Sequence, residues 1–69
     1  MRFPIGAAVQ DNYGKVGRVV RVQPMLRLRG YTPVLFDGLD QPVLVRSATL
    51  AYLARTYGAW IAWGRRNAA

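Results

Sequence analysis

Residues 13–22 read YGKVGRVVRV and predict a tight turn that leads into a β-strand. Asp11 and Asn12 come just before the strand signal, and their side chains commonly hydrogen-bond to turn amides, while Gly14 tolerates a positive φ. Gly17 indicates a bulge or the close approach of another backbone, because it lacks a Cβ atom. The valines of the segment favour a strand. Because two of them are consecutive, we expect both faces to be partly covered, as in a closed barrel.

Short apolar runs separated by turn signals continue along the chain. Residues 7–10 predict a first strand, and residues 26–29 alternate between leucine and arginine. Residues 31–36 and 42–46 predict two further strands, separated by a turn at residues 37–40. Runs that recur about every ten to twelve residues are typical of a sandwich or a small barrel. The sequence therefore predicts a single, mainly β domain of about five short antiparallel strands.

The last third of the chain carries helix signals. Four apolar residues recur with helical spacing: Leu50, Leu53, Ala54 and Tyr57. We therefore expect a helix or helical turn over residues 48–57, with Ser47 as its N-cap. Gly58 either ends this helix, so that residues 59–63 form a closing strand, or lies within a longer helix. Residues 64–69 predict a basic, frayed tail.

The composition leaves few devices for stabilising so short a chain. A domain of 69 residues buries only about 60% of the surface that its unfolded chain exposes. The sequence contains no cysteine and no histidine, which excludes disulfides, thiolate chemistry and the usual zinc sites. Three scattered aspartates do not suggest a cation site, so we expect neither metal nor cofactor. Self-association is the remaining device, and the 52% of apolar residues is consistent with a homo-oligomer.

The charge favours a polyanionic partner. Ten basic residues, nine of them arginine, stand against three acidic ones, for a net charge of +7. Such a balance is typical of proteins that bind nucleic acid or anionic lipid, although charge can also serve solubility alone. The first residues do not resemble a secretory signal. The apolar stretch 48–63 is interrupted by Arg55 and is shorter than the ~20 residues of a membrane span, so we expect a cytoplasmic protein.

Residues 14–22 place glycine, glycine, valine and valine as in the Gly-x-x-Gly-x-Val-x-x-Val core of KOW motifs, which this segment resembles. KOW motifs occur in SH3-like barrels of ribosomal proteins and transcription elongation factors, where they commonly contact RNA or protein. Gly6 and Val9 fit the Gly-x-x-Val opening of many SH3-like first strands. The tight match covers about nine residues, and the expected strand order extends the resemblance over residues 5–45. The resemblance implies an SH3-like barrel.

The architecture also resembles that of the type II dihydrofolate reductases, which are SH3-like barrels of similar length that form tetramers. Their fourth strand carries a Val-Gln-Ile-Tyr segment that contacts cofactor and folate. The comparable residues here are Val43-Leu44-Val45-Arg46, without the glutamine and the tyrosine. The resemblance therefore extends to the architecture and not to the activity.

The residue inventory does not favour catalysis. The chain offers no histidine as a general base, no cysteine nucleophile and no carboxylate pair at obvious spacing. Asp37 and Asp40 flank a turn, where carboxylates usually accept hydrogen bonds from turn amides. We therefore expect a protein that is not an enzyme.

The basic residues give the preferred functional hypothesis, a small module that binds DNA or RNA through an arginine-rich face. If the two basic segments are neighbours, five cations line one surface and contact phosphates: Lys15, Arg18, Arg21, Arg27 and Arg29. Tyr13 and Tyr31 lie near these segments and are candidates for stacking on bases. A solvated face without a ligand is the simpler alternative.

Trp60 and Trp63 lie in the apolar C-terminal section, where they favour a core or an interface over base stacking. The alternative function is accordingly a protein-interaction or inhibitory module of phage or plasmid type. It would dock through a barrel groove or through the surface of these two tryptophans. A helix lying on an anionic membrane has weaker support, because its basic residues are sparse.

Overall fold

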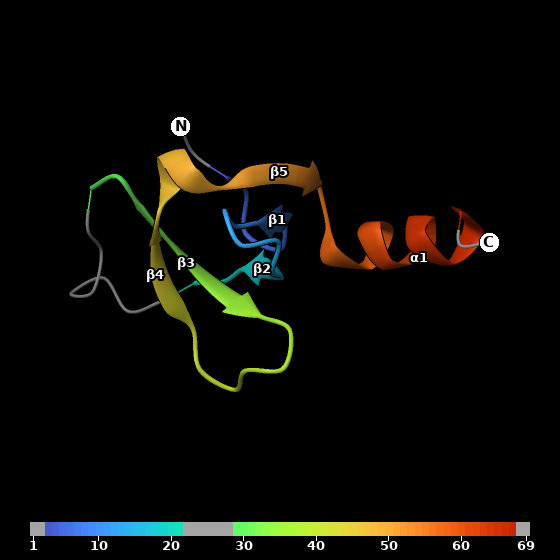
Figure 1. Cartoon of the computed structure of the whole chain (residues 1–69), viewed down its shortest axis with the longest axis horizontal. Coiled ribbons are helices and arrows are strands. Elements are labelled where there is room, and N and C mark those ends of the chain that lie inside the picture. Colours follow the sequence, from blue (N-terminus) through green and yellow to red (C-terminus); the bar gives the residue numbers. More distant parts are fainter. Residues whose placement is uncertain (1–2, 22–28, 68–69) are drawn as a thin grey trace.

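The computed structural model of the protein describes residues 3–21 and 29–67 (Figure 1). Its one antiparallel sheet contains five strands: β1 (Ala8–Gln10), β2 (Val16–Val19), β3 (Tyr31–Phe36), β4 (Val43–Arg46) and β5 (Ala51–Ala54). The spatial order is β4-β3-β2-β1-β5, so consecutive strands are neighbours until β5 returns to pair with β1. An α-helix, α1 (Tyr57–Asn67), follows the last strand. The predicted class, mainly β with five short antiparallel strands and a C-terminal helix, is confirmed.

The sheet is open, in contrast to the closed barrel that the consecutive valines suggested. Its order ends at β4 on one side and at β5 on the other, and no pairing joins these two strands in the part of the chain that the structure describes. Along β2, Gly17 and Val19 are buried, whereas Arg18 is exposed. One face of β2 therefore carries the core, while its other face is in contact with solvent. The alternating segment 26–29 lies mostly outside the described residues.

The hydrophobic core is small and lies on one face of the sheet. Among the described residues, six buried side chains from the strands and their flanks form it: Ala7, Val9, Val19, Val34, Phe36 and Leu50. Phe3 and Val45 are partly buried and pack against this cluster. In residues 3–21 and 29–67, Val9 and Val34 are the largest side chains that are fully buried.

Gly17 marks a close approach between neighbouring strands, as the sequence predicted. It pairs with Val9 on one side and with Phe36 on the other. A Cβ atom at this position would lie 2.7 Å from the carbonyl oxygen of Leu35, 2.7 Å from Cγ1 of Val34 and 2.8 Å from Cα of Phe36. No side chain larger than hydrogen fits between these strands.

The turn before β2 also has the predicted chemistry. The carboxylate of Asp11 accepts hydrogen bonds from the amides of Tyr13 at 2.9 Å and Lys15 at 2.8 Å. Gly14 adopts φ of +85°, the left-handed conformation that favours glycine. The β1–β2 hairpin is therefore closed by residues that are adjacent in sequence.

The predicted helix over residues 48–57 is wrong. The chain makes one 3-10 turn, Ser47–Thr49, and then enters β5, where Val9 pairs with Tyr52. Leu50 is buried in the core between these two elements. A helical spacing of apolar residues does not exclude a strand, and pairing with β1 satisfies the backbone of this segment in the folded chain.

The helix instead begins at Tyr57, and its N-cap is Thr56, whose Oγ1 accepts a hydrogen bond from the amide of Ala59 at 3.0 Å. Gly58 therefore lies in the first turn of α1, and a closing strand over residues 59–63 is wrong. Residues 64–67 are helical, so the expected basic tail starts within α1. None of the residues of α1 is buried, and Figure 1 shows the helix projecting away from the sheet beyond β5. No helix in the described ranges has the length and hydropathy needed to cross a bilayer.

Candidate nucleic-acid interface

The antiparallel topology brings all three acidic residues to one end of the sheet. The three aspartates all lie in the two hairpin turns, Asp11 between β1 and β2, and Asp37 and Asp40 between β3 and β4. These turns are neighbours, because the amide of Asp37 donates a hydrogen bond to the carbonyl oxygen of Val16 at 2.9 Å. They form what we call the turn end of the sheet.

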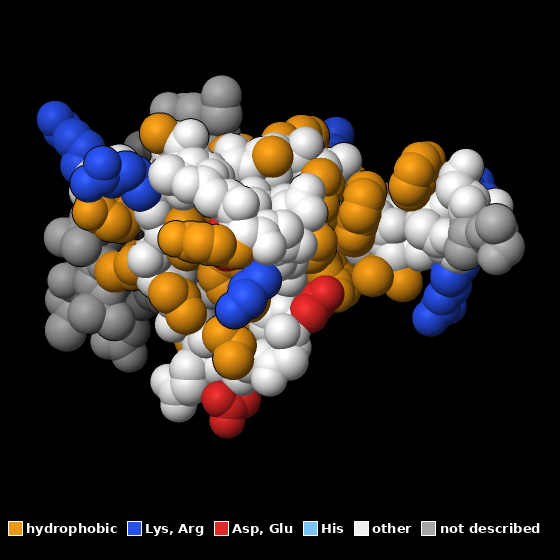
Figure 2. Space-filling model, in the orientation of Figure 1, with side chains coloured by type: hydrophobic (Ala, Val, Ile, Leu, Met, Phe, Trp, Pro, Cys, Tyr) orange, Lys and Arg blue, Asp and Glu red, His pale blue; other side chains and the backbone are white. Residues whose placement is uncertain are grey.

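The opposite end of the sheet carries three arginines and a tyrosine. We call these residues the basic end: Arg21, Arg29, Tyr31 and Arg46. The end of β2, the start of β3 and the end of β4 meet there, since Val20 donates its amide to the carbonyl oxygen of Pro33 at 3.1 Å and Tyr31 pairs with Arg46. On the face shown in Figure 2, basic side chains gather at the left edge, near the start of β3, while acidic groups lie toward the β3–β4 turn.

Tyr31 and Arg46 are directly opposite each other on adjacent strands. Residues in this relation have Cβ atoms about 4.5–5.5 Å apart, close enough for an aromatic ring and a guanidinium group to act on one ligand. Both side chains are exposed, Tyr31 by 40%. The pair therefore offers a planar ring beside a cation at the edge of the sheet.

Two hydrogen bonds from Ser47 position the basic end. The amide of Ser47 donates to the carbonyl oxygen of Gly30 at 2.8 Å, which ties the Arg29–Gly30 turn to the end of β4. The hydroxyls of Ser47 and Thr32 share a buried hydrogen bond of 2.6 Å. Gly30 has φ of +83°, so the turn that carries Arg29 depends on the conformational freedom of glycine.

The structure brings only part of the predicted site together. Arg21, Arg29 and Tyr31 lie at the basic end, whereas Lys15 and Tyr13 lie in the β1–β2 turn at the other end. Lys15 and Arg21 are six residues apart on one extended segment, which is about 20 Å at roughly 3.3 Å per residue. The exposed Arg18 lies between them on β2, and Arg27 is outside the described residues.

Arg46 was missed by the sequence reasoning. It is the last residue of the predicted fourth strand, and its relation to Tyr31 follows from the register in which Val34 pairs with Val43. A hairpin between the third and fourth strands was foreseeable, but its register depends on the conformation of the turn. Arg46 could have been predicted from its position: it ends the fourth strand, and in an antiparallel hairpin the end of that strand lies beside the start of the third strand, at Tyr31.

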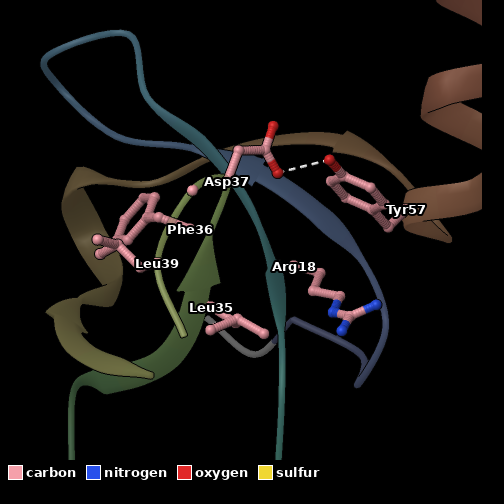
Figure 3. A pocket seen from close by; sticks show the side chains of 7 residues that line it. Arg18, Leu35, Phe36, Asp37, Leu39 and Tyr57 are labelled. Atoms are coloured by element: carbon pink, nitrogen blue, oxygen red, sulfur yellow. Dashed lines mark hydrogen bonds between the residues drawn. The ribbon is translucent and has the colours of Figure 1, made fainter. Parts of the chain in front are cut away.

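A shallow hollow of about 200 Å³ lies elsewhere on the surface, between β2, the β3–β4 turn and the start of α1 (Figure 3). Arg18, Leu35 and Leu39 line it together with Asp37 and Tyr57. The hydroxyl of Tyr57 donates a hydrogen bond to the carboxylate of Asp37. This bond joins the first residue of the helix to the turn after β3, and it gives Asp37 a structural role other than the turn contacts that we expected.

The hydrogen bond to Asp37 raises the pKa of Tyr57 above its ordinary value of 10.0. Burial and the negative charge of Asp37 raise the pKa further, while the positive charge of Arg18 opposes them. The phenol is therefore the form that the folded protein favours.

A Tyr57→Phe substitution is expected to destabilise the protein by about 1 kcal/mol at neutral pH through loss of this hydrogen bond. Because the folded-state pKa is the higher one, the hydrogen bond contributes fully below pH 10 and its contribution is lost as the pH rises through the raised folded-state pKa. Urea unfolding of both proteins at neutral and strongly alkaline pH measures the difference. A difference that stays constant at alkaline pH would contradict the assignment.

Comparisons of the chain with family models, with curated proteins and with solved structures found no match.

Proposed function

We propose that the protein is a small, non-enzymatic cytoplasmic module that binds nucleic acid through its basic end. The observation that carries the proposal is the cross-strand pair of Tyr31 and Arg46, which lies beside Arg21 and Arg29. The three aspartates lie at the other end of the sheet.

The chemistry of these side chains suits a phosphate backbone. Guanidinium groups present a planar fork of donors that can bind phosphate oxygens in pairs. A tyrosine ring beside them can stack on an unpaired base, an interaction worth about 1–3 kcal/mol. Because the acidic residues lie at the turn end, the field of the protein would orient an approaching polyanion toward the basic end.

The resemblance of residues 14–22 to KOW motifs is consistent with the same proposal, since modules with this motif commonly contact RNA or protein. We extend the proposal to an SH3-like fold for the five-stranded sheet. Arg18, in the middle of β2, would extend the contact surface from the basic end. Lys15 and Tyr13 would contribute only to a ligand that also reaches the turn end.

The test is a fluorescence anisotropy titration of labelled single-stranded and double-stranded oligonucleotides at two salt concentrations. Arg29→Ala and Arg46→Ala are each expected to weaken binding about 3–10-fold and to reduce the salt dependence by about one counterion. Lys15→Ala is the matched control, because it removes one exposed cation at the turn end, and it should change affinity less than twofold. Tyr31→Ala should weaken single-strand binding more than duplex binding.

Two outcomes would contradict the proposal. One is that the wild-type protein does not bind oligonucleotides at low salt. The other is that Arg29→Ala and Arg46→Ala both leave the affinity within twofold of wild type, which would remove the basic end from the interface.

The alternative function, docking to a protein through Trp60 and Trp63, is favoured by a separate observation. Both tryptophans lie on a helix without a buried residue, and Trp63 is 51% exposed. This surface lies on α1, apart from the basic end, so the two functions do not exclude each other.

A further inference from the structure

Helix α1 lacks the packing that a short helix requires. It has 11 residues, whereas isolated helices shorter than about 12–15 residues are marginal in water. It also contains Gly58 and Gly64, which have low helix propensity, and a Cβ atom at either position would meet nothing within 4 Å. Two hydrogen bonds attach its first residue, Tyr57, to the rest of the domain. The amide of Tyr57 donates to the carbonyl oxygen of Gly6 at 2.7 Å, and its hydroxyl donates to the carboxylate of Asp37. The remainder of the helix projects from the domain (Figure 1).

One side of α1 carries a tryptophan ridge, formed by the half-buried Trp60 and the exposed Trp63, with a small residue at each side. The rings of Trp60 and Trp63 stack with centroids 5.5 Å apart and an angle of 12° between their planes. With about 3.6 residues per turn, Ala59 and Gly64 share this side of the helix with the tryptophans. A second copy of the helix in antiparallel orientation fits this pattern. When Trp60 is level with the partner's Trp63, Ala59 is level with the partner's Gly64.

In the same arrangement, the arginines of α1 are complementary to a carboxylate of the partner copy. Its last turn contains Arg65 and Arg66, and the helix contains no acidic residue. The carboxylate of Asp37 lies at the first residue of α1, where it accepts the Tyr57 hydroxyl. Arg66 is nine residues beyond Tyr57, about 13 Å along the axis at roughly 1.5 Å per residue. In the antiparallel pair, Arg66 of each copy is level with Tyr57 of the other copy and close to its Asp37.

We infer that α1 is a dimerisation arm, on which two copies of the chain pair antiparallel through Trp60 and Trp63. The interface is isologous, so each contact occurs twice. The carboxylate of Asp37 beside the start of the helix and the arginines at its end can pair with the arginines and the carboxylate of a second, antiparallel copy. An anionic membrane, in contrast, would attract the arginines and repel Asp37.

The expected dimer is weak and reversible. An aromatic residue buries about 150–250 Å² at most, so two tryptophans from each copy supply no more than about 1,000 Å². Stable specific interfaces bury about 1,200–2,000 Å² in total. Each protomer also has a net charge of +7, so the two domains repel each other at low salt.

The test is sedimentation velocity over a series of protein concentrations, at low and at moderate salt. We expect the mass to rise from 7.7 kDa toward twice that value with concentration, and to do so more readily at moderate salt, because salt screens the repulsion. Nucleic-acid binding, in contrast, weakens as salt is added. The two proposals therefore fail independently: one through the absence of a dimer in sedimentation, the other through the absence of oligonucleotide binding in the anisotropy titration.

Three variants locate the interface. Trp63→Ala should weaken dimerisation at least tenfold, while Tyr13→Ala, which removes an aromatic residue that is 88% exposed in the β1–β2 turn, should leave it unchanged. Asp37→Asn keeps an acceptor for the Tyr57 hydroxyl but removes the charge, and it should weaken dimerisation about threefold. Circular dichroism of each variant confirms that the domain is folded.

Each of the other outcomes would overturn the inference. A wild-type protein that is monomeric at every concentration has no dimerisation arm, and a Trp63→Ala variant that dimerises like wild type places the interface elsewhere. Tryptophan emission is also measured with vesicles that contain phosphatidylserine. A monomer whose emission shifts to shorter wavelength only with these vesicles would identify a lipid surface as the occupant.

Discussion

Replacing Gly17 with alanine is expected to lower the free energy of unfolding by about 3 kcal/mol. The added methyl group would lie 2.7 Å from a carbonyl oxygen and 2.8 Å from a Cα atom of β3, and neither atom can move without moving the strand. Gly17 also pairs with Val9 of β1, so a shift of β2 away from β3 would disturb both of its neighbours. A domain of this length has a total stability of roughly 3–10 kcal/mol, so this one methyl group removes a large part of it.

Urea unfolding followed by circular dichroism measures this loss, and Gly58→Ala is the matched control. Gly58 lies in the first turn of α1, and a Cβ atom there would meet nothing within 4 Å. Alanine at this position should stabilise the protein by about 0.5–1 kcal/mol through its higher helix propensity. If Gly17→Ala unfolds at the same urea concentration as wild type, the close approach of β2 and β3 is wrong.

The parts of the fold that sequence reasoning predicted are those that depend on adjacent residues. The β1–β2 turn follows from Asp11 and Gly14, and the close approach at Gly17 follows from the missing Cβ in a strand of valines. The strand 31–36 was predicted with the bounds that β3 has in the structure. In each case, the chemistry of a few neighbouring residues strongly favours the local conformation, although at Gly17 the sequence left a bulge as an alternative to the close approach.

The errors arise where distant parts of the chain decide the conformation. The spacing of Leu50, Leu53 and Ala54 fits a helix, but pairing with β1 gives residues 51–54 strand partners instead. Thr56 is also a preferred N-cap residue, and its hydroxyl caps the helix, whereas the hydroxyl of Ser47 is hydrogen-bonded to that of Thr32. Which of the two hydroxyls is available to cap a helix cannot be predicted from the sequence alone.

The candidate site was predicted in part for the same reason. That arginines are abundant is visible in the composition, but their neighbours depend on strand direction and register. Lys15 and Arg21 are close in sequence and lie far apart along the sheet, whereas Tyr31 and Arg46 are 15 residues apart and form a pair. The separation of the aspartates from the basic end likewise follows only from the antiparallel order.

Replacing Ser47 with alanine is expected to cost about 2 kcal/mol, because it leaves the Thr32 hydroxyl buried without a partner. Both residues are at least 92% buried, and their hydroxyls are 2.6 Å apart. Thr32→Val should cost a similar amount, since it leaves Ser47 unpaired instead. An unsatisfied buried hydroxyl is costly, whereas removing both hydroxyls is much less so.

A double-mutant cycle measured by urea unfolding tests this hydrogen bond. The variant with both Ser47→Ala and Thr32→Val is expected to lose less stability than the sum of the two single variants, with a coupling of at least about 1 kcal/mol. Strictly additive losses would show that the two hydroxyls do not interact. The same cycle reports on function if loss of the hydroxyl pair shifts the backbone at Ser47, because the amide of this residue holds the Gly30 turn. If the hydroxyl pair positions the basic end, oligonucleotide affinity should fall in Ser47→Ala and recover in part in the double variant.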